Sequence, residues 1–117
     1  MLRASSKLNQ SSIDIRSVVD GNVESLIPTG ALLASFAEAL VSRRSDLKGL
    51  RLKLVDELGE QGMIEAAGTA ANFQRMVRIA DAIGIPLDDR SLLAADSLIE
   101  DLNIRTFHSA SNTYESV

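Results

Sequence analysis

The chain contains no cysteine and only one histidine, His108, which lies close to the C-terminus. The absence of cysteine excludes disulfide bonds, thiolate metal sites and thiol catalysis together. It also fits a reducing compartment, so we expect a cytoplasmic protein. A lone histidine in a serine-rich tail is usually a surface residue, and a zinc site needs several ligands at compatible spacing. We therefore expect neither a metal nor a cofactor.

Aromatic residues and prolines are also scarce. Aromatics make up 3% of the chain and prolines number two, whereas 45% of the residues are hydrophobic. The hydrophobic residues are mainly Ala, Leu, Ile and Val, a balance that favours helices. The 117 residues match one ordinary domain that can bury a core without disulfides or metal. No apolar run reaches the roughly 18 residues that span a bilayer, so we expect no membrane partner.

Positive charge is not in excess. The chain has twelve Lys and Arg against sixteen Asp and Glu, which gives a formal net charge of −4. A nucleic-acid partner requires clustered positive charge that displaces counterions from the phosphates. We therefore expect no nucleic-acid partner.

Helical spacing of apolar residues divides the chain into several segments. A short helix is expected within residues 12–20, capped by Ser12, and longer helices over 29–44 and 47–58. A turn over residues 59–62 precedes a long helix from about 63 to 83, and a last helix runs to about residue 103. The pattern predicts an all-α, compact bundle of about four to five helices: a flexible N-terminus (1–11), a single helical domain (12–103) and a loose tail (104–117).

The clearest helix-stop signal in the sequence lies at the end of the long helix. Gly84 suits the left-handed position just past a helix, Ile85 can fold back towards Ala80, and Pro86 prevents continuation. Either Asp88 or the aspartate after it then suits the cap of the last helix. We read these neighbouring carboxylates as caps rather than as a catalytic acid and base.

The N-terminal half of the long helix consists mostly of small residues, whereas its C-terminal half contains larger apolar residues. Small residues let two helix backbones approach closely, and a helix this long in a small chain cannot be enclosed on all sides. We therefore expect it to lie in a subunit interface of a homo-oligomer, as a dimer or a higher assembly. The interface residues that we predict are Ala67, Ala71, Phe73, Met76, Val77 and Ala80.

Two arginines on the long helix are candidates for ligand binding. Arg75 and Arg78 are three residues apart and share one face, from which they could bind a carboxylate or phosphate. Asp81 offers Arg78 a simpler ion-pair partner. His108 is a further candidate, as a general base or ligand. The identity of any small-molecule ligand is not encoded in these residues.

The motifs GALLASFAEAL and AANFQRMVRIADAIGIPLD, with the leucine-striped segment between them, resemble the alkylhydroperoxidase D-like, carboxymuconolactone decarboxylase family. The resemblance covers roughly Gly30 to Asp88, about half the chain. Residues 36–38 match the first motif of the family, and Phe73 and Arg78 match the aromatic and arginine positions of the second. Val77 stands where many members have asparagine.

Three alternatives for function remain open at this point. The hydroperoxidase branch uses a Cys-x-x-Cys pair, and the absence of cysteine excludes that chemistry. The first alternative is a non-catalytic oligomeric domain that acts through protein–protein association. The second is a divergent decarboxylase-type enzyme with a Cys-independent pocket between subunits that uses Arg75, Arg78 or His108. The third is a regulatory binder of a small anionic ligand.

Overall fold

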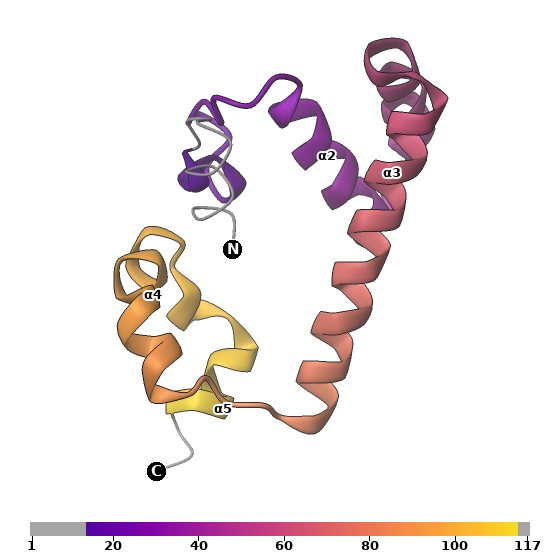
Figure 1. Cartoon of the computed structure of the whole chain (residues 1–117). Coiled ribbons are helices and arrows are strands. Elements are labelled where there is room, and N and C mark those ends of the chain that lie inside the picture. The colour runs from indigo at the N-terminus through magenta and orange to yellow at the C-terminus, as the bar shows by residue number, and fades with distance from the viewer. Residues whose placement is uncertain (1–13, 115–117) are drawn as a thin grey trace. The chain divides into compact units, whose positions relative to one another are not determined.

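The computed structural model describes residues 14–114, apart from the side chains of Ala94, Ala95 and Tyr114. The flexible N-terminus expected for residues 1–11 lies outside this range. Every regular element within residues 14–114 is helical, which confirms the all-α class (Figure 1). The chain divides into two compact units, Met1–Phe73 and Gln74–Val117. The elements in chain order are η1 (Ile15–Val18), α2 (Gly30–Val41), α3 (Leu47–Ile83), α4 (Asp89–Asp101), η2 (Ile104–Thr106), η3 (His108–Ala110) and α5 (Ser111–Tyr114), where η marks a 3₁₀ helix.

The first element, η1, is shorter and tighter than expected. Only residues 15–18 are helical, in a 3₁₀ turn, and Asp14 caps them. The Asp14 side chain accepts a hydrogen bond from the backbone amide of Arg16 at 3.0 Å. Ser12, the cap expected from the sequence, lies outside the described residues. A carboxylate at this position satisfies an amide that the short turn leaves without a helical partner.

Helix α2 confirms the helix expected over residues 29–44 and supplies two of the buried residues of the first unit. Phe36 and Ala39 are 2% and 0% exposed. The helix begins after Thr29, which takes a left-handed conformation with φ of 60°. Gly30 fits closely there, because a Cβ atom at this position would lie 2.1 Å from Ser25 Oγ, so that the Ser25 side chain would have to move. After the helix, the Arg44 amide donates to the Ala39 carbonyl at 2.9 Å and closes the turn.

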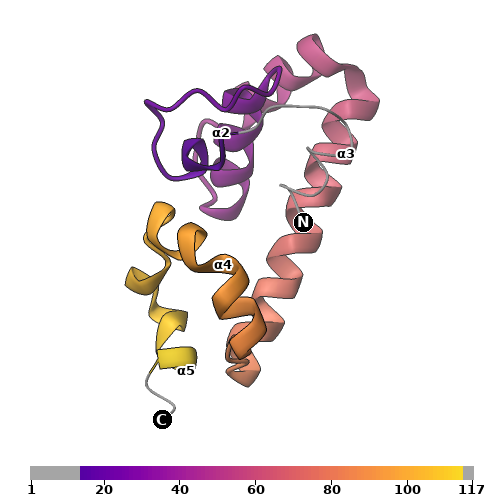
Figure 2. The same ribbon diagram turned by 60° about the vertical axis from the view of Figure 1, so that its left-hand side comes forward.

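Helix α3 contains a break at Gly59, where φ is 75° and ψ is 173°. Figure 2 shows the direction of the chain changing between the two segments of α3. The turn expected over residues 59–62 is thus confined to one residue, and the second segment begins earlier than predicted. Glycine permits this conformation because it has no Cβ atom. Glycine at position 62 also permits the break, because a Cβ atom there would lie only 2.7 Å from Leu58 Cβ on the other side of the break.

The second unit begins within α3 and contains the predicted helix stop. Gly84 has φ of 64°, and the Ile85 amide donates to the Ala80 carbonyl at 3.2 Å. This bond is the fold-back that the sequence predicted. Asp88 then caps α4, with its Oδ1 accepting from the Ser91 amide at 2.8 Å, which confirms the predicted capping role.

The described part of the C-terminal tail differs from the loose structure expected for residues 104–117. It forms η2, η3 and α5 in succession. Local hydrogen bonds define the turns: the Thr106 amide donates to the Asn103 carbonyl at 3.0 Å, and the Ala110 amide to the Phe107 carbonyl at 2.9 Å. Such short turns need no apolar periodicity, which explains why the sequence pattern did not reveal them.

Candidate association surface on α3

Large apolar side chains in the C-terminal part of α3 are exposed to solvent. The exposed fraction of the residue is 56% at Phe73, 49% at Met76, 51% at Val77 and 67% at Ile83. With 3.6 residues per turn, residues 73, 76, 80 and 83 repeat at intervals of three and four and so lie along one side of the helix. The helix therefore carries a row of apolar residues on one side, and Phe73, Met76 and Ile83 in this row are exposed.

The same spacing continues towards the N-terminal end of this segment. Residues 62, 66 and 69 precede Phe73 at intervals of four, three and four. Alternation of three and four is the repeat by which two helices pack in a shallow left-handed coil. We call this row of seven the α3 seam: Gly62, Ala66, Thr69, Phe73, Met76, Ala80 and Ile83. The repeat of three and four can be recognised in the sequence, whereas the predicted interface residues follow from residue size and apolar character.

The six predicted interface residues do not share one face of α3. Successive residues are rotated by about 100°, so Ala67 lies about 180° from Met76 and Ala71 about 140° from it. Phe73, Met76 and Ala80 belong to the seam, and Val77 borders it. A single partner helix that contacts the seam therefore cannot also contact Ala67 and Ala71.

The three candidate ligand-binding residues are exposed and lie on two elements. Arg75 and Arg78 belong to α3, whereas His108 begins η3. When the Gln74 amide is oriented with its oxygen towards Arg78, that oxygen accepts from Arg78 Nε at 3.1 Å and from Nη2 at 3.3 Å. Arg78 thus bonds to a residue one turn earlier, rather than to Asp81 as the sequence suggested.

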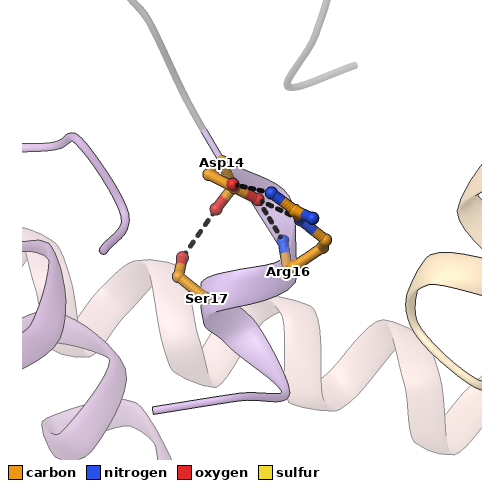
Figure 3. A network of polar contacts seen from close by, with 3 residues as sticks. All are labelled: Asp14, Arg16 and Ser17. Atoms are coloured by element: carbon orange, nitrogen blue, oxygen red, sulfur yellow. Dashed lines mark hydrogen bonds and ion pairs between the residues drawn. The ribbon is translucent and has the colours of Figure 1, made fainter. Parts of the chain in front are cut away.

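A compact polar network surrounds Asp14, as Figure 3 shows. Its carboxylate accepts from Arg16 Nε at 3.0 Å and from Arg16 Nη2 at 2.5 Å, in addition to the Arg16 amide. Ser17 Oγ donates to the Asp14 carbonyl at 2.7 Å. The hydrogen bonds from Arg16 hold the pKa of Asp14 at about 2, below the ordinary value of 3.8. The network fixes the start of η1 through contacts among near neighbours in sequence.

The described residues offer few features of a chemical centre. In residues 14–114, no group of three or more His, Asp or Glu could hold a metal ion. No polar or charged side chain in this part of the chain is buried. None of its helices combines the length and apolar character needed to cross a membrane. The exposed apolar side chains of α3 give one surface from which a function can be argued.

Comparison with known proteins gives no further assignment. No protein-family model, curated protein or solved structure matches this chain. The resemblance to the alkylhydroperoxidase D-like family remains a prediction from the two sequence motifs.

Proposed function

We propose that this chain acts as a self-associating helical domain, without a catalytic centre of its own, and that the C-terminal part of α3 is its association surface. The observation that carries the proposal is the exposure of Phe73, Met76, Val77 and Ile83 along one helix. Burial of apolar surface is the main favourable term in most protein association. A continuous apolar stripe on a helix is the feature that a partner helix would cover.

The proposal also includes a more specific fold than the all-α class. The motifs in residues 30–40 and 70–88 support a compact bundle that resembles the alkylhydroperoxidase D-like, carboxymuconolactone decarboxylase family. In this arrangement the long helix lies between subunits of a homodimer or higher assembly. The absence of cysteine separates the chain from the thiol-dependent members of that family. Association is the role that such a scaffold retains when the thiol pair is missing.

The proposal is tested by measuring the molar mass of the wild-type chain at micromolar concentration by size-exclusion chromatography with light scattering. We expect at least a dimer. Met76→Asp places a charge in the α3 seam, where an unpaired buried carboxylate is strongly unfavourable. This variant should be monomeric under the same conditions.

Ile64→Asp is the matched control. Ile64 is 58% exposed on the same helix, but it lies about 120° from Met76 around the helix axis. The same change in charge and size at Ile64 should leave the mass of the assembly unchanged. A monomeric wild-type chain, or a Met76→Asp variant that assembles as the wild type does, would contradict the proposed function.

A further inference from the structure

Helix α3 changes direction at a single residue (Figure 2). Gly59 has φ of 75° and ψ of 173°, whereas the rest of Leu47–Ile83 keeps helical φ and ψ angles. This combination of angles is essentially confined to glycine, because the Cβ atom of any other residue would be strained there. The helix on both sides of the bend, as far as Phe73, belongs to the first unit. The bend in this unit therefore depends on the backbone of one residue.

A second glycine permits the bend for a different reason. A Cβ atom at Gly62 would lie 2.7 Å from Leu58 Cβ. In a straight helix, residues four apart have Cβ atoms about 5–6 Å apart, so alanine at position 62 would fit if α3 were continuous. The bent form thus requires glycine at both positions, whereas a straight helix requires it at neither.

The apolar residues on the two sides of Gly59 also suit a continuous helix. With 3.6 residues per turn, a straight α3 would place Leu58 in line with Met76, about five turns later. It would likewise place Leu47 in line with Ile83, about ten turns later. The apolar residues of both segments would then share one side of the helix. The apolar periodicity is therefore continuous at the point where the backbone bends.

Acidic side chains next to the bend oppose the straight form. In a continuous helix, Glu60 would lie four residues from Asp56 and three from Glu57, which are the spacings at which like charges on a helix repel each other. The two glycines weaken the straight form further, because glycine is a poor helix former. The gain from a continuous helix is thus opposed by local costs in the same seven residues, 56–62.

We infer that Gly59 is a hinge at which α3 interconverts between the bent form and a straight, continuous helix. Straightening would join the apolar row of the first segment to the α3 seam, so the hinge would set the length of that row. The inference concerns the shape of one chain and does not depend on self-association.

The two forms differ in a distance within the first unit. Lys48 and Ala71 are exposed and lie on opposite sides of the hinge. Because the chain has no native cysteine, Lys48→Cys and Ala71→Cys can be combined and labelled with nitroxides. Double electron–electron resonance then measures the distance between the labels, in an excess of unlabelled chain that removes coupling between copies. A straight helix separates the two positions by roughly 35 Å along its axis, and a bend shortens this separation.

In the labelled chain with all its glycines we expect two distance components, one near the straight value and one shorter. Gly59→Ala should raise the ratio of the straight to the bent component at least about tenfold, because alanine is strained in the bent form and favours a helix. Gly62→Ala should shift the ratio in the same direction, because its Cβ atom meets Leu58 only in the bent form.

Gly49→Ala and Gly68→Ala are the matched controls. Both glycines lie in α3 without a positive φ, and a Cβ atom added at either would have open space. They gain the same helix propensity as the hinge variants, but they should leave the ratio of the two components unchanged.

A single distance component in the labelled chain with all its glycines would overturn the hinge. The same conclusion would follow if Gly59→Ala and Gly62→Ala gave the ratio found for Gly68→Ala. If Gly59→Ala loses the helical circular dichroism signal, Gly62→Ala decides alone, and an unchanged distance distribution in that variant would show that α3 is fixed in its bent form.

Discussion

The backbone amide of Leu87 donates a 2.9 Å hydrogen bond to the hydroxyl of Thr113, which lies 26 residues later in the chain. The bond joins the segment after α3 to the C-terminal helix α5 within the second unit. Gly84 lies beside the same helix, since a Cβ at this position would be 3.7 Å from Asn112 Oδ1. The C-terminal residues are therefore positioned by the segment that ends the long helix.

Replacing Thr113 with valine should release this contact. Valine keeps the shape of threonine but cannot accept the hydrogen bond from Leu87, and loss of an exposed bond of this kind costs about 0.5–1.5 kcal/mol. We expect faster hydrogen exchange of the Leu87 amide and a small decrease in the free energy of unfolding. Amide exchange measured by NMR provides the test.

Thr106→Val is the control for this prediction, because Thr106 Oγ1 donates only locally, to the Asn103 carbonyl at 2.7 Å. It should not change exchange at Leu87. Equal exchange rates at Leu87 in the wild type and in Thr113→Val would show that the bond does not hold the tail in solution.

The sequence predicted the fold best where local chemistry determines the backbone. The end of α3 is an example, because Gly84 tolerates a positive φ and Pro86 prevents a further helical bond. The break at Gly59 was located only approximately. A glycine in a helix does not reveal whether the helix bends there, since that depends on contacts such as Leu58 against Gly62. The 3₁₀ turns near the C-terminus depend on single hydrogen bonds and leave no periodic pattern.

The predicted interface residues stay a prediction, although helix geometry divides them into two groups. Phe73, Met76 and Ala80 were identified by their apolar character, and the structure places the first two at the surface. Ala67 and Ala71 were grouped with them because small residues favour close helix contacts. Their rotation around the helix axis separates them from Met76, and this follows from helix geometry rather than from residue type. The length of the helix in a small chain predicted that one side would stay exposed. Which side this is could not be predicted, because it depends on which residues of the folded chain cover the helix.

The stability of the first unit should depend strongly on Leu54. Its side chain is fully buried in α3, whereas Leu52, two residues earlier, is 64% exposed. Leu54→Ala removes buried methyl groups and leaves a cavity, which typically costs about 2–5 kcal/mol. Leu52→Ala removes the same atoms from the surface, where substitutions usually change stability by about 0.5 kcal/mol or less. Urea unfolding followed by circular dichroism would measure both.

The pair of leucines is informative because both variants have the same composition and the same helix propensity. A large loss of stability for Leu54→Ala with little change for Leu52→Ala would confirm the register of α3 in this region. Equal losses would mean that Leu52 is also covered in solution. The reverse order would contradict the described orientation of the helix.

The carboxyl group of Asp14 should titrate at unusually low pH. Hydrogen bonds from the Arg16 side chain and amide stabilise the ionised form and hold its pKa at about 2, against an ordinary value of 3.8. Because the pKa is lower in the folded chain, the contribution of this group to stability is complete above about pH 3.8 and is lost as the pH falls through about 2. An NMR titration of the carboxyl carbon of Asp14 would report the midpoint directly. Arg16→Gln removes the guanidinium donors and should shift the midpoint upwards, towards 3.8, whereas a wild-type midpoint already near 3.8 would show that the Arg16 contacts do not persist in solution.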